Sequence, residues 1–530
     1  DYDGDGWDDL IIGTGKGGPL AVYHNDGRGG FKAVDEPPLN WPVRRDLTTV
    51  LGIESGFIAG SSNYRDGSTN GGCVRIYDVK RKVAGDSILG QAFSSGPLAL
   101  ADMDGDGDLD LFVGGRVLPG RYPEPATSLL MKNEGGRLVL AQRWEKLGLV
   151  SGAVFSDLDG DGSPELILAC EWGPVRVLRR EAGSYQEATQ QLGLAQYTGW
   201  WNGVTTGDLD GDGKLDVIAT NWGLNSRYQA SRKHPRRIYY GDMDGNGTVD
   251  LVEAYFDDGL GKEVPDRWFA VVRMAIPFVA EKIGSYEAYG GSSVEEIYGD
   301  KLREAGVAEA NTLASMVFFN RGDHFEGMAL PVEAQLAPAF GVCVGDMDGD
   351  GNEDVFLSQN FFATNPDNER SDAGRGLWLK GDGKAGLKAV KGQESGIKVY
   401  GEQRGCALAD YDGDGRVDLV VTQNGNDTKL YHNVGARPGL RVRLKGSPGN
   451  STAIGAAMRI IYDGKQGPVR EVHAGSGYWS QDSSVQVLGM AGTPTRIWVR
   501  WPGGKTSEGA IPANANEISI QATGQIERIR

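Results

Sequence analysis

The stretch DMDGDGDLDLFVGG, residues 102–115, decides the fold of this chain, because a nine-residue acidic loop runs straight into an apolar strand. The loop carries aspartates at its positions 1, 3, 5 and 9 and glycines at positions 4 and 6. The glycines permit a tight turn, and the inward-pointing carboxylates, joined by the backbone carbonyl of position 7, form an oxygen cage suited to Ca²⁺. Seven copies occur, and they start at Asp1, Asp102, Asp157, Asp208, Asp242, Asp346 and Asp410.

Each copy predicts five metal ligands, because three or four carboxylates held this close repel one another unless a cation lies between them. We expect up to seven structural Ca²⁺ ions, with the weakest binding where Glu165 follows Pro164 and where Asn246 replaces an aspartate. The predicted ligands are Asp1, Asp3, Asp5, Trp7 and Asp9; Asp102, Asp104, Asp106, Asp108 and Asp110; Asp157, Asp159, Asp161, Ser163 and Glu165; Asp208, Asp210, Asp212, Lys214 and Asp216; Asp242, Asp244, Asn246, Thr248 and Asp250; Asp346, Asp348, Asp350, Asn352 and Asp354; Asp410, Asp412, Asp414, Arg416 and Asp418.

The sequence that follows each loop excludes an EF-hand, which has a glutamate at position 12 and helices on both sides. Here the last acid is at position 9, and runs such as LFVGG, LILAC and LVVTQ follow. These β-branched apolar runs are typical of buried strands, so the loops belong to a β protein.

The chain has 530 residues, of which 39% are hydrophobic, and a net charge of −18. Because the acids are concentrated in the loops, bound Ca²⁺ would offset most of this charge, and the balance argues against a nucleic-acid partner. No run reaches the roughly 18 apolar residues of a membrane helix. The chain opens on the first ligand of a loop, so we expect that an upstream piece, with a signal peptide, has been removed. Loops of this kind suit millimolar calcium, which indicates a secreted, periplasmic or cell-surface protein.

Four cysteines, Cys73, Cys170, Cys343 and Cys406, lie singly in strand-like text. The last two occupy strands entering a loop, where other copies have Ala or Val. We interpret all four as small core residues in preference to a disulfide or a metal site.

The spacing of the loops predicts a β-propeller, because the middling intervals suit a blade of four strands with its loops. The interval between Asp208 and Asp242 leaves two counts open: seven blades if these loops share one blade, which we favour, and eight if each opens its own. Residues 266–312 have helical spacing and predict a helical insertion, with Ser292 and Ser293 as N-cap candidates. We expect the propeller to span residues 1–436, and a compact all-β domain to span residues 437–530.

The loop-plus-strand unit resembles the FG-GAP, or VCBS, repeat of integrin-type β-propellers. The tail, with NSTAIGAAMRI at 450–460, VREVHAGSGYWSQ at 469–481 and RIWVRWPGGK at 496–505, resembles the ASPIC/UnbV domain. The combination is similar to bacterial relatives of cartilage acidic protein and covers essentially the whole chain. The resemblance implies adhesion, matrix or binding roles. One departure is that the stretch that is usually HFGLG lies here within VQVLGMAG, which lacks the histidine.

Two functions remain open from the sequence. The favoured one is a non-catalytic, calcium-stabilised scaffold that binds another protein or an extracellular glycan through loops gathered on one face. The alternative is an extracellular carbohydrate-active enzyme of the polysaccharide lyase type, for which the candidate cluster is Arg227, Tyr228, His234 and Arg237.

Aromatic and histidine residues add candidate binding surfaces. Beside the candidate cluster, Trp200, Trp201 and Trp222 are expected to offer stacking surfaces for a sugar. His24 and His432 share one repeat position, which indicates a structural role, and we expect core packing for His473. The tripeptide at 321–323, Arg-Gly-Asp, fits the turn of the repeat itself, so we assign no adhesion role to it.

Overall fold

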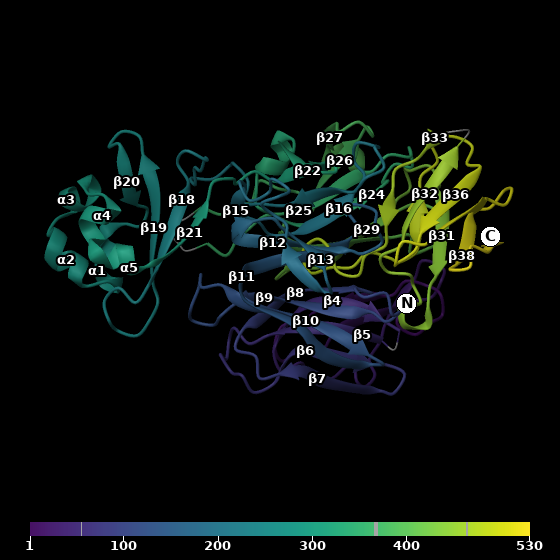
Figure 1. The fold of residues 1–530 in the computed structure, drawn as a ribbon, viewed down its shortest axis with the longest axis horizontal. Helices are drawn as coiled ribbons and strands as arrows, with labels where there is room; N and C mark the ends of the chain where they lie inside the picture. The colour runs from purple at the N-terminus through teal and green to yellow at the C-terminus, as the bar shows by residue number, and fades with distance from the viewer. Residues whose placement is uncertain (55, 365–368, 463–464) are drawn as a thin grey trace.

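The structure, a computed structural model, describes residues 1–54, 56–364, 369–462 and 465–530. Within these residues strands are the main regular structure and almost all of them pair antiparallel, which confirms the predicted all-β class. Figure 1 shows a helix-bearing sheet at one end, the main body of sheets in the middle and the C-terminal strands at the other end. No described helix is long and apolar enough to cross a membrane.

Successive antiparallel meanders form the propeller, and we number them blade 1 to blade 7. The first strands of blades 2 to 7 pack on one another in chain order around a common axis. Blade 1 contains β1 (Leu10–Ile12), β2 (Ala21–Asn25) and β3 (Phe31–Ala33); blade 2 contains β4 (Asp46–Ile53), β5 (Gly56–Ser62), β6 (Gly72–Asp78) and β7 (Val83–Leu89); blade 3 contains β8 (Ser94–Ala101), β9 (Asp110–Val117), β10 (Ala126–Glu134) and the start of β11 (Arg137–Ser156); blade 4 contains the end of β11, β12 (Glu165–Pro174), β13 (Arg176–Glu181) and β14 (Ser184–Glu187), with β15 (Thr198–Trp200) on β12; blade 5 contains β16 (Val204–Gly207), β17 (Asp216–Ala219), β22 (Met316–Asn320) and β23 (Phe325–Ala329); blade 6 contains β24 (Ala339–Gly345), β25 (Asp354–Gln359), β26 (Leu377–Gly381) and β27 (Leu387–Val390); blade 7 contains β28 (Glu402–Ala409), β29 (Asp418–Asn424) and β30 (Lys429–Tyr431).

Strand β11 is shared by two blades. Its residues from Arg137 to Gly148 pair with β10, and those from Leu149 to Ser156 pair with β12. Blades 3 and 4 are therefore one continuous sheet of strands that bends at the middle of β11.

An asparagine side chain ties one blade to the acidic loop of the preceding blade at three places, and one of these contacts, from blade 1 to blade 7, closes the ring. Asn25 of blade 1 donates from Nδ2 to the carbonyl of Tyr411 in blade 7 at 2.7 Å. The same contact joins Asn320 to the carbonyl of Leu158 and Asn433 to the carbonyl of Met347, both at 2.8 Å.

Beside β1, a cavity of about 840 Å³ is lined by residues of β1, β4 and β28.

The residues between β17 and β22 form an insertion with its own sheet, which lies outside the ring (Figure 1). The Asp242 loop connects two strands of this sheet, so it opens no blade, and the described residues form seven blades. Ser293 caps α4 in a capping box with Glu296, whereas Ser292 ends α3. The elements are β18 (Arg236–Gly241), β19 (Asp250–Asp257), β20 (Lys262–Pro265), β21 (Gly306–Ala310), α1 (Phe269–Ala275), α2 (Phe278–Ile283), α3 (Tyr286–Gly291), α4 (Val294–Tyr298) and α5 (Asp300–Glu304).

The C-terminal residues fold into two small sheets, one of which contains a parallel pair, β31 with β38. One sheet has β31 (Leu440–Lys445), β35 (Gln486–Leu488), β38 (Glu517–Gln521) and β39 (Ile526–Arg528); the other has β32 (Ala457–Tyr462), β33 (Lys465–Gln466), β34 (Arg470–Glu471), β36 (Arg496–Arg500) and β37 (Thr506–Ala510). Three short helices complete the described elements: η1 (Val332–Gln335), α6 (Gly392–Ser395) and η2 (Pro448–Asn450).

A loop of the C-terminal domain, residues 473–484, fills the axis of the propeller; we call it the axial loop. It contacts the first strands of blades 2 to 7, and its glycines allow close approach: a Cβ on Gly477 would lie 2.6 Å from the carbonyl oxygen of Val342. The axial hydrogen bonds are Leu100 N to Ala474 O at 2.8 Å, Gly477 N to Val204 O at 2.8 Å, Trp479 Nε1 to Ser151 O at 2.9 Å, Gly52 N to Gln481 Oε1 at 2.8 Å and Leu408 N to Asp482 Oδ1 at 2.8 Å.

Candidate metal centres

The acidic loops share one backbone geometry, which the loop at Asp102 illustrates. The carboxylate of Asp102 accepts the N–H groups of Gly105 at 2.8 Å and Gly107 at 3.0 Å. Both glycines have positive φ, +78° and +93°, which side chains with a Cβ rarely adopt. The carboxylate of Asp110 accepts the N–H groups of Met103 at 3.1 Å and Asn133 at 2.8 Å. The last predicted ligand is therefore fixed both by its own loop and by the third strand of its blade.

This geometry brings carboxylates together as the sequence predicts. Oxygens from positions 1, 3 and 9 lie within 4.8 Å of one another in the Asp1, Asp102 and Asp157 loops. Oδ1 of Asp208 and Oδ1 of Asp348 are buried without a hydrogen-bond partner among the residues that the structure describes. A buried carboxylate oxygen with no donor is costly, and a hard cation among oxygen ligands would satisfy it. The donor set thus fits Ca²⁺, whose presence remains a prediction.

Burial perturbs the acids at position 9 most. It raises the pKa of Asp216 and of Asp418 to about 7, and nearby carboxylates add to the shift. Burial also raises the pKa of Glu165 and of Asp354 to about 8. Without a cation these cages hold protons near neutral pH, and a bound cation would displace them.

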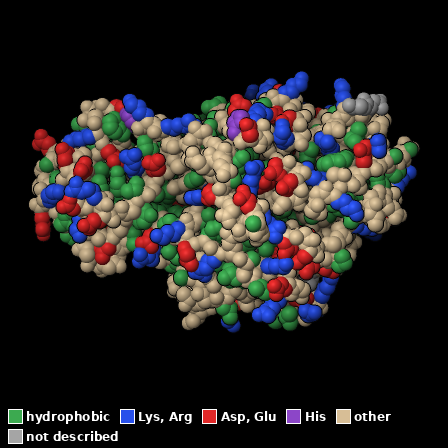
Figure 2. All heavy atoms as spheres, viewed as in Figure 1, with side chains coloured by type: hydrophobic (Ala, Val, Ile, Leu, Met, Phe, Trp, Pro, Cys, Tyr) green, Lys and Arg blue, Asp and Glu red, His purple; other side chains and the backbone are tan. Residues whose placement is uncertain are grey.

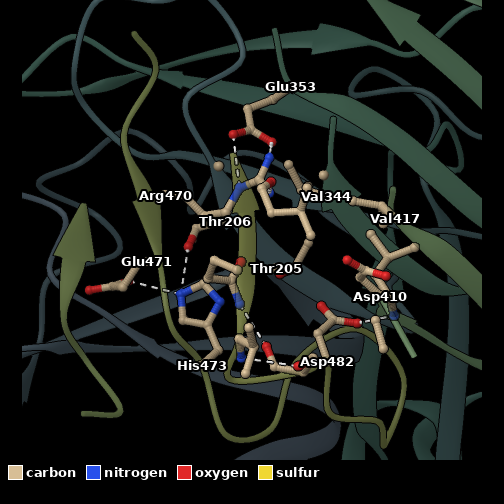
Figure 3. A pocket seen from close by; sticks show the side chains of 18 of the residues that line it. Thr205, Thr206, Val344, Glu353, Asp410, Val417, Arg470, Glu471, His473 and Asp482 are labelled. Atoms are coloured by element: carbon tan, nitrogen blue, oxygen red, sulfur yellow. Dashed lines mark hydrogen bonds and ion pairs between the residues drawn. The ribbon is translucent and has the colours of Figure 1, made fainter. Parts of the chain in front are cut away.

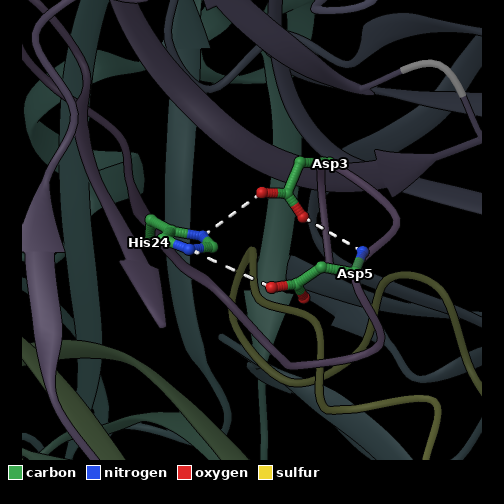
Figure 4. A group of neighbouring side chains, drawn as sticks. All are labelled: Asp3, Asp5 and His24. Carbon is green, nitrogen blue, oxygen red and sulfur yellow. Dashed lines mark hydrogen bonds and ion pairs between the residues drawn. The ribbon is translucent and has the colours of Figure 1, made fainter. Parts of the chain in front are cut away.

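A basic side chain from the third strand also reaches each of five loops, which the sequence analysis missed. His24 lies with Nδ1 3.2 Å from Oδ2 of Asp3 and Nε2 4.0 Å from Oδ2 of Asp5 (Figure 4). The strand pairing places four other basic residues at the register of His24, directly after the residue opposite loop position 10. A basic residue at this repeat position was the sequence signal that could have revealed these contacts. These residues are Lys132, Arg179, Lys380 and His432.

The loops differ in surroundings. Six lie at the ends of first strands or at the start of blade 1, whereas the Asp242 loop lies in the insertion. In that loop, Thr248 Oγ1 donates to Asn246 Oδ1 at 2.5 Å, which occupies one predicted ligand oxygen. At position 7, the N–H group of Asp108 donates to Asp106 at 3.0 Å, and that of Ser163 to Asp161 at 2.7 Å.

The C-terminal domain covers all six loops of the ring. Arg441 pairs with Asp410, and Arg500 places Nε 2.9 Å from Oδ2 of Asp157. Val469 N donates to Oδ2 of Asp208 at 3.0 Å. The remaining contacts are Arg443 Nη2 to Gly6 O at 2.9 Å, Ser447 Oγ to Gly107 O at 2.8 Å and Arg437 N to Asp348 O at 3.1 Å.

Between this domain and the ring lies a small chamber of about 40 Å³. Figure 3 shows Arg470 paired with Glu353 and His473 directed toward Glu471. Nε2 of His473 lies 2.8 Å from Oε2 of Glu471, and burial raises the pKa of Asp482. His473 is thus largely buried, and its ring contacts the buried carboxylate of Glu471.

The cluster nominated for a lyase lies in and beside the insertion, and its cations face carboxylates. Arg227 Nη2 lies 2.7 Å from Oδ2 of Asp266, and Arg237 Nη1 lies 3.3 Å from Oε1 of Glu263. His234 lies 3.4 Å from Oδ1 of Asp258.

The nominated tryptophans separate into two places. Trp200 and Trp222 stack with ring centroids 4.4 Å apart, and Tyr228 lies beside them. Trp201 is fully buried and donates from Nε1 to the carbonyl of Tyr197, so its prediction as a stacking surface was wrong.

The fold and its acidic turns define an all-β propeller protein with a C-terminal β domain. Two family models match: residues 157–219 match the FG-GAP-like repeat, and residues 446–526 match the domain described as ASPIC and UnbV. The chain therefore contains an FG-GAP-like repeat followed by an ASPIC/UnbV domain, which confirms the predicted architecture. No curated protein matches the chain. Among solved structures, an exotype rhamnogalacturonan lyase, YesX, is 14% identical over 78% of this chain and 80% of its own, with a TM-score of 0.28.

Proposed function

We propose that this protein is a non-catalytic, calcium-stabilised extracellular scaffold that binds another protein or a glycan. The observation that carries the proposal is the repeated convergence of carboxylates in loops that end the strands of a ring. In this proposal the ions are structural: they bind the folded chain more tightly than the unfolded chain and so raise its stability. Millimolar extracellular calcium would keep such sites filled.

The free face of the propeller is the one that carries the insertion. The C-terminal domain covers the loop face and occupies the axis, so partners have access to the opposite end (Figure 1). Trp268, at the N-cap of α1, and Met274 within the helix have exposed fractions of 70% and 74%, and the exposed Val271 lies between them. The spacing of three places these side chains on one side of the helix, which supports a partner contact there.

Charge on the visible surface does not favour a single class of ionic partner. Figure 2 shows Lys and Arg side chains intermixed with Asp and Glu over this view of the molecule. A mixed surface gives little long-range attraction for a polyanion. The proposed contact is therefore apolar or aromatic at its centre.

The calcium part is tested by melting the ion-stripped protein with and without added Ca²⁺, using Mg²⁺ as the control cation. We expect Ca²⁺ to raise the melting temperature by many degrees and Mg²⁺ to do much less, because Mg²⁺ demands a stricter octahedral geometry. Equal melts in excess chelator and in millimolar Ca²⁺ would remove the basis of the proposal. The partner part is tested by screening the protein and its Met274→Ser variant against glycan and extracellular-protein arrays.

A further inference from the structure

Two of the four cysteines face each other between blades 6 and 7. Sγ of Cys343, in β24, lies 3.1 Å from Sγ of Cys406, in β28. Both side chains are buried in one cluster with Phe356, whereas Cys73 and Cys170 lie in other clusters. We propose that Cys343 and Cys406 are a redox-active thiol pair, which forms a disulfide joining blade 6 to blade 7 when it meets a small-molecule disulfide.

Cys343 and Cys406 occupy two repeat positions, here called slots, which face each other between neighbouring blades. At this interface both slots hold cysteine. Cys343 lies three residues before the first ligand of its loop, and Cys406 lies four residues before the first ligand of the next loop. At the interface of blades 3 and 4 the same slots hold Ala99 and Ala153, which also pack in one cluster. The architecture therefore brings these positions together, and alanine fits both of them.

The backbone leaves room for the sulfur of Cys406. A Cβ added to Gly341 would lie 2.8 Å from Sγ of Cys406 and 2.6 Å from the carbonyl oxygen of Arg404. Because residue 341 lacks a side chain, strands β24 and β28 approach closely at the level of the two sulfurs. Covalent joining needs a shift of the side chains, and the two strands already lie side by side.

The thiols are buried, each in a residue with an exposed fraction of 2%, so a reagent reaches them when the interface between blades 6 and 7 opens locally. Burial, with the Asp482 carboxylate nearby, raises the pKa of Cys343 well above its usual value, so Cys406 is the thiol that reacts first. Its thiolate attacks one sulfur of the small-molecule disulfide, which forms a mixed disulfide and releases one thiolate.

Cys343 then completes the exchange. Its thiolate attacks the Cys406 sulfur, the protein disulfide forms, and the second small-molecule thiolate leaves. Both departing thiolates take up the protons that the two cysteines lose, so one S–S bond is exchanged for another and two small thiols are produced. The oxidising equivalent comes entirely from the small-molecule disulfide.

The test uses the full chain, folded with Ca²⁺, and oxidised glutathione as the probe. After incubation and alkylation of remaining thiols, a non-reducing digest analysed by mass spectrometry is expected to contain one peptide pair linked through Cys343 and Cys406. Cys73 and Cys170 are expected to be recovered as alkylated free thiols after unfolding. Oxidation is expected to raise the melting temperature by several degrees, reversibly with dithiothreitol.

Matched variants separate the pair from the other cysteines. Cys406→Ala is expected to fold, as Ala153 does in its slot, and to lose both the linked peptide and the oxidation-dependent melting shift. Cys73→Ala, in another cluster, is expected to keep both. Three results would overturn the proposal: free Cys343 and Cys406 after prolonged exposure, a reaction that stops at glutathione on Cys406, or stoichiometric Zn²⁺ binding that needs both cysteines and Asp482.

Discussion

Arg500 of the C-terminal domain forms an ion pair with Asp157, the first ligand of the blade 4 loop, with Nε 2.9 Å from Oδ2. The same carboxylate accepts two backbone N–H groups of its own loop. A single side chain therefore links the turn of a blade to the docking of the domain that covers it. If the loops bind ions as we propose, ion binding and domain docking are coupled wherever this arrangement recurs, as it does at Asp410 with Arg441.

Replacing Arg500 with methionine should lower the free energy of unfolding by about 1–3 kcal/mol, because a buried carboxylate loses its charged partner. The matched control is Arg496→Met in the same strand, where the ion pair with Glu508 is exposed and worth about 0–1 kcal/mol. Chemical denaturation in Ca²⁺ and in chelator measures the free energy of unfolding of both variants. The Arg500 effect should be larger in chelator, since no ion then compensates Asp157. Equal losses in the two variants would contradict this coupling.

Asp208→Asn should change stability with opposite sign in the two ionic conditions. Oδ1 of Asp208 is buried and has no donor within the described part of the chain, and burial raises the pKa of this carboxyl to about 6. The neutral amide relieves repulsion in ion-stripped protein and so raises its melting temperature. In Ca²⁺ the variant loses a charged ligand and melts lower than the original chain.

The control for this experiment is Asp242→Asn, in the insertion loop. It should lower the number of bound Ca²⁺ ions by one while leaving the main melting transition nearly unchanged, because that loop lies outside the ring. Ion counting by mass spectrometry and calorimetry of the same samples give the two readouts. A lower melt for Asp208→Asn in both conditions would contradict the predicted reversal.

Stability should depend on pH in opposite directions with and without calcium. Burial raises the pKa of Glu165 and of Asp354 to about 8 in the folded, ion-free chain, well above the values near 4 of unfolded carboxyls. The folded state then binds more protons than the unfolded state, so ion-free stability is greatest at low pH and is lost as pH rises from about 4 to about 8. With saturating Ca²⁺ the protons compete with the ion, and stability should instead fall on acidification. Melting temperatures between about pH 5 and pH 8.5 give both slopes, and parallel slopes would refute the prediction.

Gly477→Ala should disturb the axial loop. This glycine has φ of +59°, and an added Cβ would lie 2.6 Å from the carbonyl oxygen of Val342, which belongs to a strand and cannot easily move. The control is Gly503→Ala, where φ is +81° but an added Cβ would meet no atom of the other described residues within 4 Å, so only the backbone cost of about 1 kcal/mol applies. We expect the Gly477 variant to lose clearly more stability and to expose the C-terminal domain to protease. Similar losses in the two variants would show that the close approach contributes nothing.

The sequence allowed the loops and the blades to be predicted because both depend on local spacing. The acidic positions, the turn glycines and the strand that follows them all lie within about a dozen residues, as in the Asp102 loop. The axial loop could not be predicted, since Gly477 and Val342 are far apart in the chain and only the closed ring brings them together. Trp201 was misassigned for a similar reason: its neighbour Trp200 lies at the surface cluster, and strand alternation places the next side chain in the core.

The shared strand from Arg137 to Ser156 has a mechanical consequence. Most neighbouring blades can separate when the side-chain contacts between them break and the segment that connects them extends. Blades 3 and 4 are joined by strand β11 itself, because one half of this strand pairs with β10 and the other half with β12, so tension applied to one blade is transmitted to the other. Under a pulling force these two should yield as a single unit, and their amide protons should exchange with deuterium at a common rate.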